Sequence, residues 1–413
     1  MLNWLNQFNI FCFLDNQGYD FQEPGFECIA AAGVRQELRA PAGRAFSALQ
    51  QFCEQNPSAW IFGHLAYDLK NETASLVSRH PDGIGFDDLY FFVPRDLLVL
   101  KEGHLQIYTD GDAQALWGAI QAQPATIIRS GRQPVTIRQR ISPDHYKKQV
   151  EALREHIHRG DCYEINFCQE FYAEEYVMEP LAVFEQLTRL SPNPFSAFYR
   201  VEHHYCCCAS PERYLKKQGR HIISQPIKGT SRRDHDNPLQ DARNRLYLRE
   251  NAKERSENVM VVDLVRNDLS RVCEPGSVKV DELFGLYSFP QVHQMISTVS
   301  GTLSASVHPV EALKATFPMG SMTGAPKIRV MQLIEEYEQT RRGLFSGAIG
   351  YFKPGENNVH DFDFNVIIRS LFYNAATQYL SFQAGGGITF YSDPEMEYQE
   401  SLLKATALLQ VLQ

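Results

Sequence analysis

The sequence predicts a mixed α/β protein of the α+β type, with strands dominating the first part of the chain. Up to about residue 140, short apolar runs such as 60–63 and 89–93 are interrupted by Gly, Pro and Asn, which is typical of strands and turns. After that point, apolar residues recur at helical spacing between further strand-like runs. The chain has 413 residues and 44% apolar content, so it can bury a sizeable core.

The first clear helix is predicted over 142–160. Ser142 can cap it, Pro143 suits its first turn, and Gly160 ends it. A helical stretch is also predicted from Asn237, although the valine-rich run 259–262 inside it would locally favour a strand. Further helices are expected over 323–338, with Ile328, Met331, Ile334 and Tyr337 inward, and over 394–412, with strands at 345–352, 364–373 and 379–383 between them.

A polar, turn-rich stretch over 123–143 is the best candidate boundary. We therefore expect an N-terminal part, 1–140, that completes the fold, and a chemically informative part, 141–413. The N-terminal part carries little chemical signal of its own.

Charge and cysteine usage restrict the class of protein. The formal charge of −9 is spread along the chain, which argues against nucleic acid as a general partner. No apolar run is typical of a signal peptide or a membrane span. The nine cysteines form no C-x-x-C pair. A cytoplasmic protein with reduced thiols is the expectation.

Two pairs of glutamates, each at a spacing of three, are candidate metal ligands. Glu254 with Glu257, and Glu397 with Glu400, would each lie on one face of a helix. Two such helices facing each other would place four carboxylates around a hard cation, and Mg²⁺ prefers carboxylates, waters and substrate oxygens. Either pair alone is more often a solvated helix face.

Two glycine-containing segments are candidates for binding an anion. The segment 384–388 follows a predicted strand and frees backbone amides, but it does not match G-x-G-x-x-G, so a dinucleotide fold is not supported. The segment 320–327 is not a phosphate loop, and Pro326 removes a donor. A turn into a helix N-terminus that presents the hydroxyls of Ser321 and Thr323 to a carboxylate fits better.

Lys228, Glu212 and His293 are candidate catalytic groups. Lys228 follows a strand-like apolar pair, and an exposed lysine at a strand end is the more common case. A desolvated lysine would instead lose its proton more easily and act as a nucleophile. Glu212 lies upstream and could be a general acid. A lone histidine such as His293 is more often structural.

Several segments, taken in this order, resemble the chorismate-utilising enzyme family over about residues 140–413. The N-terminal part resembles it more weakly, through 63–68. The segments are Ala-Ser-Pro-Glu-Arg at 209–213, Pro-Ile-Lys-Gly-Thr at 226–230, the stretch 257–268, Gly-Ser-Met-Thr-Gly-Ala-Pro-Lys at 320–327, the stretch 346–351, Ala-Gly-Gly-Gly-Ile at 384–388, and 397–400.

The resemblance implies a single large unit of two packed antiparallel sheets with outer helices and a deep active site. It implies that Glu257 and Glu400 bind Mg²⁺, which bridges to the chorismate carboxylate, and that Glu254 and Glu397 reach the ion through water. The remaining implied site comprises Lys228, Glu212 and His293 as catalytic residues, and Ser321, Thr323, Tyr351, Arg369, Gly385, Gly386, Gly387 and Lys404 as chorismate-binding residues.

Within the family, Lys228 decides the expected reaction. Family members with lysine here aminate chorismate to 4-amino-4-deoxychorismate, in para-aminobenzoate and folate biosynthesis, whereas alanine accompanies formation of anthranilate and pyruvate. Members that activate water carry a lysine in the strand near 163–166, which is absent here. Anthranilate synthesis remains the alternative. A binding subunit without activity is a further alternative, but no expected glutamate or general acid is missing.

The resemblance also implies a covalent role for Lys228 and a separate source of ammonia. Lys228 would add to ring carbon 2 while Glu212 protonates the departing hydroxyl, and ammonia would finish at carbon 4. For this we expect burial and Mg²⁺ to lower the pKa of Lys228 from about 10.4. No cysteine is flanked by glycines as in a glutaminase nucleophile turn. We therefore expect a separate glutamine amidotransferase subunit.

Overall fold

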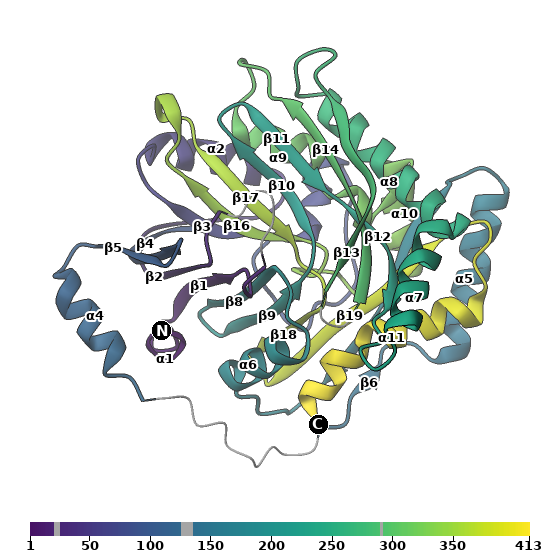
Figure 1. Ribbon diagram of the computed structural model, residues 1–413, viewed down its shortest axis with the longest axis horizontal. Coiled ribbons are helices and arrows are strands. Elements are labelled where there is room, and N and C mark those ends of the chain that lie inside the picture. Colours follow the sequence, from purple (N-terminus) through teal and green to yellow (C-terminus); the bar gives the residue numbers. More distant parts are fainter. Residues whose placement is uncertain (20–24, 125–134, 290–291) are drawn as a thin grey trace.

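The computed structural model describes residues 1–19, 25–124, 135–289 and 292–413. Within these ranges, nineteen strands pair antiparallel into one hydrogen-bonded network, with helices around it (Figure 1). The predicted α+β class is confirmed. Among the described residues, no helix is both long enough and apolar enough to cross a bilayer.

The strand network forms two layers that share the long strands β2 (Cys28–Ala40) and β4 (Leu89–Lys101). Their pairing shifts register between Val34 and Gln36, opposite Pro94, which suits a residue that cannot donate to a ladder. The first layer contains β1 (Ile10–Asp15), β5 (His104–Thr109), β6 (Arg138–Gln139), β7 (Glu164–Ala173), β8 (Phe195–Val201), β9 (His204–Ser210), β15 (Gly324–Ala325), β18 (Ser370–Asn374) and β19 (Tyr379–Ile388). The second contains β3 (Ile61–Leu65), β10 (Arg213–Gln218), β11 (His221–Gln225), β12 (Ile227–Arg232), β13 (Lys279–Ser288), β14 (Val292–Thr302), β16 (Ala348–Lys353) and β17 (Asp361–Val366).

The core lies between these layers, and helices cover the other face of the first one. Along β2, Ile29 and Ala31 join the cluster shared by both layers, whereas Ala30 and Ala32 join a second cluster with α6 and α11. This alternation is the period of two that a strand imposes on its side chains. Both faces of the first layer are therefore covered.

Five helices gather on one side of the strands, next to β12, β13 and β19 (Figure 1). They are α5 (Pro143–His158), α7 (Pro238–Glu250), α8 (Ala252–Ser270), α10 (Lys327–Tyr337) and α11 (Pro394–Leu412). The other helical segments are α1 (Leu2–Leu5), α2 (Ala45–Gln55), α3 (Lys70–Thr73), α4 (Ala113–Gln121), α6 (Pro180–Leu190), α9 (Pro309–Thr316), and the 3₁₀ turns η1 (Tyr67–Leu69), η2 (Gly320–Met322) and η3 (Glu356–Asn358).

Most helix predictions are confirmed. The Ser142 hydroxyl caps α5 by accepting from the His145 N–H at 3.2 Å, and the valine-rich run 259–262 is helical within α8. The expected helix over 323–338 was wrong at its start, because 324–325 pairs with β7 and α10 begins at Lys327. Ile328 is 57% exposed, so its predicted inward position was also wrong.

Two strand predictions need correction at their ends. The run 345–352 forms a strand only from Ala348. The run 364–373 is two strands, because the chain turns between Val366 and Ser370, where Arg369 adopts a φ of +52°. A non-glycine residue at positive φ is uncommon and suits a turn, not a strand.

The N-terminal strands pair directly with strands of the later part, β1 with β8 and β3 with β16. The boundary near residue 140 stays a prediction, and residues 125–134 of the stretch that suggested it lie outside the described residues.

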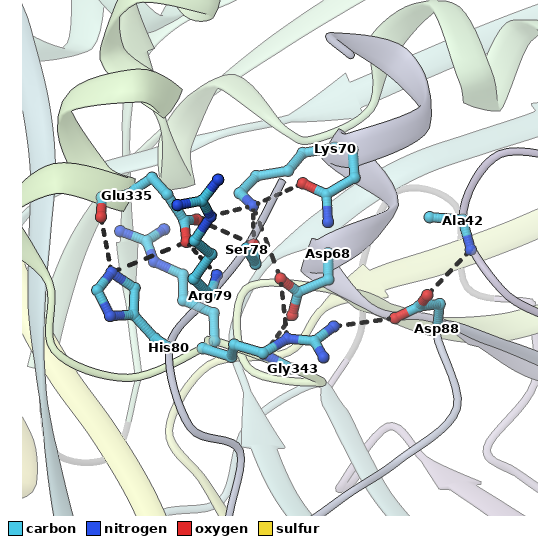
Figure 2. Close-up of polar contacts among 12 residues, drawn as sticks. Ala42, Asp68, Lys70, Ser78, Arg79, His80, Asp88, Glu335 and Gly343 are labelled. Carbon is cyan, nitrogen blue, oxygen red and sulfur yellow. Dashed lines mark hydrogen bonds and ion pairs between the residues drawn. The ribbon is translucent and has the colours of Figure 1, made fainter. Parts of the chain in front are cut away.

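A buried ion network adds to this connection (Figure 2). The Lys70 side chain is 1% exposed, and its Nζ lies 3.1 Å from Glu335 on α10 and 3.6 Å from Asp68. Asp68 also accepts from the backbone N–H of Gly343 at 3.0 Å. Removing one partner of a buried ion pair typically costs about 3–5 kcal/mol. Residues 68–70 are thus held firmly against α10 and the segment after it.

Candidate active site

A buried lysine of the second layer meets a buried glutamate of the first layer. Lys228 of β12 donates through Nζ to Oε1 of Glu164, the first residue of β7, at 2.5 Å. Lys228 is 9% exposed and Glu164 is 2% exposed. A charge-assisted hydrogen bond of this length is short even for its class. The lysine is therefore an interior group of a polar pocket, and not an exposed residue at a strand end.

Gly387 of β19 makes room for this pair. A Cβ atom at this glycine would lie 2.8 Å from Glu164 Oε1, 3.0 Å from Lys228 Nζ and 3.4 Å from Glu257 Oε2. One residue earlier, a Cβ atom on Gly386 would lie 3.2 Å from Glu397 Oε2 and 3.4 Å from Glu400 Oε1. The glycine segment thus passes close to both helices that carry the paired glutamates.

The paired glutamates of α8 and α11 face one another across this glycine edge. Lys253 of α8 connects the helices, with Nζ 3.0 Å from Glu397 Oε1 and 3.7 Å from Glu257 Oε1. Glu257 Oε1 and Glu397 Oε2 are buried without a hydrogen-bond partner among the described residues. An unsatisfied buried carboxylate oxygen is costly, and a divalent cation would relieve that cost.

The outer members of the two pairs are more accessible. Glu400 accepts from Lys404 at 2.7 Å, and the same ammonium donates to the Gly385 carbonyl at 2.9 Å. Lys404 holds the pKa of Glu400 down at about 2, against the effect of burial. Burial, followed by the Glu400 charge, raises the pKa of Glu254. Glu254 is also the side chain closest to a Cβ atom built on Gly229, next to Lys228.

These carboxylates are the type of ligand that a hard cation prefers, although their side chains do not converge on one position. Across the described ranges, no three His, Cys, Asp or Glu side chains converge tightly enough to enclose a metal ion as they stand. Two unpartnered buried oxygens and the ammonium of Lys253 between the helices indicate a place where positive charge is stabilising. Carboxylate oxygens such as these are the ligand type that Mg²⁺ prefers.

The expected lowering of the Lys228 pKa was wrong for the protein in this state. Burial alone disfavours the ammonium, but the charges of Glu164, Glu257 and Glu212 outweigh it, so the pKa of Lys228 is raised. Burial likewise raises the pKa of Glu257, to about 8. Lys228 is therefore an ammonium as the pocket stands, and it would have to give up a proton before it could act as the nucleophile predicted from the sequence.

Glu212, Arg369 and Ser321 form the other side of the pocket. Burial raises the pKa of Glu212 to about 7, although the Ser321 hydroxyl and the charges of Lys228 and Arg369 oppose the shift. Burial lowers the pKa of Arg369 to about 10, with Glu212 acting in the opposite direction. Glu212 and Ser321 also line one cavity with Gly320 and Met319. A carboxyl that titrates near neutral pH can serve as a general acid.

Three predicted residues lie elsewhere or are otherwise engaged. Both ring nitrogens of His293 are used, one with the Ser288 hydroxyl at 2.8 Å and the other with Asp241 at 3.1 Å. The Thr323 hydroxyl donates within its own turn, to the Met319 carbonyl at 3.1 Å.

Tyr351 is the third, because it belongs to an aromatic group with Phe26, Trp60 and Phe62 that borders a different cavity, next to Arg213. These contacts give no support to the predicted roles of His293 as a catalytic residue or of Thr323 and Tyr351 as chorismate-binding residues, and those roles stay predictions.

The sequence pattern missed residues that organise the site. Arg342, 4% exposed, donates to Glu338 at 2.6 and 2.9 Å, to the Met322 carbonyl at 2.6 Å and to the Asn166 carbonyl at 2.8 Å. It therefore ties the turn that carries Ser321 to the strand that begins at Glu164. Arginine at a spacing of four from a glutamate is a common surface pattern, so only burial distinguishes this pair.

A family model described as chorismate binding enzyme matches residues 10–410, almost the whole chain. The chain belongs to the chorismate-binding enzyme family. The resemblance seen in the motifs of the later part thus extends through the N-terminal part, which shares its strands.

Relatives of this chorismate-binding enzyme include proteins named aminodeoxychorismate synthase component 1. The one from Klebsiella aerogenes is 37% identical over 355 residues, covering 85% of this chain and 76% of the relative. The one from Bacillus subtilis is 32% identical over 369 residues, covering 85% and 76%. A crystal structure of anthranilate synthase component I from Streptococcus pneumoniae superimposes with a TM-score of 0.79 at 27% identity, covering 97% of this chain and 95% of that one.

Proposed function

We propose that this chorismate-binding enzyme aminates chorismate to 4-amino-4-deoxychorismate, as the component 1 subunit of an aminodeoxychorismate synthase. The observation that carries this proposal is that Lys228 is buried and close enough to Glu212 for their charges to interact, while burial raises the pKa of Glu212 to about 7. This reaction needs a nucleophile on the enzyme and an acid for the leaving hydroxyl, and Lys228 with Glu212 supplies both. The relatives named for this activity support the same reaction.

Chorismate carries two carboxylates, so its binding requires positive charge in a pocket rich in glutamates. Arg369 supplies one cation beside Glu212. Gly385, Gly386 and Gly387 pair with β7, so only those of their amides that this pairing leaves unused would be available to a substrate carboxylate. Glu257 and Glu400, with Glu254 and Glu397, would hold Mg²⁺. When bound, the ion would neutralise and orient a substrate carboxylate. The unpartnered oxygens of Glu257 and Glu397 support this assignment.

The chemistry assigned to the chain's own groups has two steps. In the first, the neutral amine of Lys228 adds to ring carbon 2, the ring double bonds shift, and the hydroxyl at carbon 4 leaves as water with the proton of Glu212. In the second, ammonia adds at carbon 4 and the lysine departs from carbon 2. Because binding already holds the reactants together in the pocket, the chemical step does not incur the loss of translational and rotational entropy that a bimolecular reaction in water would.

The ammonia is proposed to come from a separate glutamine amidotransferase subunit. A glutaminase needs a reactive cysteine thiolate, which requires a lowered thiol pKa. All nine cysteines of the chain are free, and desolvation by burial raises the pKa of each one. The component 1 naming of the relatives also supports a second subunit.

The test is a product assay on the purified chain with chorismate and Mg²⁺. With an ammonium salt we expect 4-amino-4-deoxychorismate, identified by mass, and with glutamine as the only nitrogen source we expect no product. EDTA should abolish turnover. Intact-protein mass spectrometry without ammonia should show an adduct of chorismate less one water.

Lys228→Ala should form no adduct, whereas Lys148→Ala, at an exposed position on α5, should behave as wild type. Release of anthranilate and pyruvate as the main products would instead identify the chain as an anthranilate synthase component. Wild-type production of 4-amino-4-deoxychorismate by Lys228→Ala would remove the assigned role of the lysine.

A further inference from the structure

The carboxylate of Glu164 is the group that Lys228 contacts most closely. Glu164 is 2% exposed and accepts from Lys228 Nζ at 2.5 Å. We propose that Glu164 is the base that takes the proton from Lys228 before the lysine attacks chorismate. The inference deepens the proposed function and rests on it, because it presupposes that Lys228 is the nucleophile.

The need for a base follows from the charges around the lysine. The carboxylates around Lys228 keep its amine protonated. A protonated amine has no lone pair with which to attack. The groups that face it are Glu164 of β7, Glu257 and Glu254 of α8, Glu212 before β10, Glu400 of α11 and the thiol of Cys168 on β7.

Each other carboxylate near Lys228 is committed to a different task. Glu257 and Glu254 are assigned to the cation, and Glu400 pairs with Lys404 at 2.7 Å. Glu212 must arrive protonated, because it delivers a proton to the leaving hydroxyl. Glu164 remains, and it is already in hydrogen-bond contact with the amine. Proton transfer along an existing hydrogen bond needs no rearrangement of the pocket.

The step balances within the site. One N–H bond of the Lys228 ammonium breaks and one O–H bond forms on Glu164, which leaves a neutral amine and a carboxylic acid. The amine lone pair then forms the bond to carbon 2, and the C4–O bond breaks as Glu212 gives its proton to the departing oxygen. When ammonia later adds at carbon 4 and the lysine departs from carbon 2, the departing amine can take the proton back from Glu164.

The experiment measures the rate of adduct formation with chorismate and Mg²⁺, without ammonia, by rapid quenching and intact-protein mass spectrometry. Glu164→Gln keeps the shape of the side chain and removes the base. We expect its rate at pH 7 to fall about 100-fold or more. Glu174→Gln, at an exposed position just beyond the same strand, is the matched control and should keep the wild-type rate.

The pH dependence separates a base from a structural support. In Glu164→Gln, the lysine must lose its proton to solvent, and the fraction of neutral amine rises about tenfold per pH unit. The ratio of the wild-type rate to the variant rate should therefore fall about tenfold for each unit of increase in pH. Taking the ratio cancels the ionisation of Glu212, which both proteins share. Glu164→Asp keeps a carboxylate, so it should be slower than wild type with a ratio that does not change with pH.

The outcomes distinguish this inference from the proposed function. If the ratio of the wild-type rate to the Glu164→Gln rate does not change with pH, whatever its size, the role of Glu164 is overturned. An adduct in wild type and none in Lys228→Ala would still leave the proposed function standing. A wild-type protein that forms no adduct would remove both. If Glu164→Gln does not fold, Glu164→Asp provides the test. A ratio of the wild-type rate to the Glu164→Asp rate that falls as the pH rises would overturn the inference.

Discussion

Alanine substitutions at the three consecutive glycines of β19 should give three different defects. A Cβ atom on Gly385 would lie 1.9 Å from the Phe167 carbonyl oxygen of the neighbouring strand. Two paired backbones cannot separate locally without losing ladder hydrogen bonds, so the fold itself must accommodate the change. Overpacking of this kind typically costs about 1–3 kcal/mol. We expect Gly385→Ala to lower the free energy of unfolding measurably.

Gly387→Ala should instead spare the fold and impair the chemistry. Its Cβ atom would meet the ends of two flexible side chains, at 2.8 Å from Glu164 Oε1 and 3.0 Å from Lys228 Nζ. These tips can move by a few tenths of an ångström. Alanine also reduces the conformational entropy of the unfolded chain, which typically stabilises a protein by about 0.4–1 kcal/mol. Displacing a reacting group by about 1 Å can cost about 100-fold in rate. A shift of a few tenths of an ångström should cost less than this, so we expect a measurable loss of kcat, of less than about 100-fold, with nearly wild-type stability.

Gly386→Ala is the intermediate member of the series. Its Cβ atom would lie 3.2 Å from Glu397 Oε2 and 3.4 Å from Glu400 Oε1, so the proposed metal ligands must shift. We expect more Mg²⁺ to be needed for half-maximal activity. Urea unfolding, kcat with saturating Mg²⁺ and a Mg²⁺ titration, measured on all three variants, separate the effects. Equal losses of stability and activity across the three positions would refute the reasoning.

Two further predictions concern Glu212 and Arg342. Because the pKa of Glu212 is raised to about 7, its acid form is present below that pH and is lost as the pH rises through it. The rate of adduct formation should therefore fall above about pH 7. Glu212→Gln should remove this fall from the pH–rate profile, together with most of the activity. Arg342→Met should lower the free energy of unfolding, measured by urea denaturation, by about 3–5 kcal/mol, because it leaves the buried carboxylate of Glu338 without its ion-pair partner. Adding Glu338→Gln to this variant should recover part of the loss.

The sequence predicted those parts of the site that local spacing determines. Glu254 and Glu257 share a face of α8, and Glu397 and Glu400 share a face of α11, as a spacing of three requires. The glycine run was correctly predicted to follow a strand, although the strand continues through it.

The protonation of Lys228 could not be predicted in the same way. The sequence left open whether Lys228 is exposed or buried, and burial alone would have lowered its pKa. The carboxylates that reverse the shift come from Glu164, Glu212 and Glu257, which are distant in sequence and meet only in the folded chain. Nothing in the residues around Glu164 marks it as a partner of β12. For the same reason, the engagement of His293 by Asp241 has no local signal.

The order of elements along the chain has a consequence for synthesis on the ribosome. The pocket needs β7, β12, β19 and α11 together, and α11 follows every other element in chain order. A nascent chain that has folded its strands but has not yet released α11 lacks Glu397 and Glu400. Domains of this size generally fold as units during or after synthesis. A truncated product should therefore be inert toward chorismate, because the site closes only with the last helix.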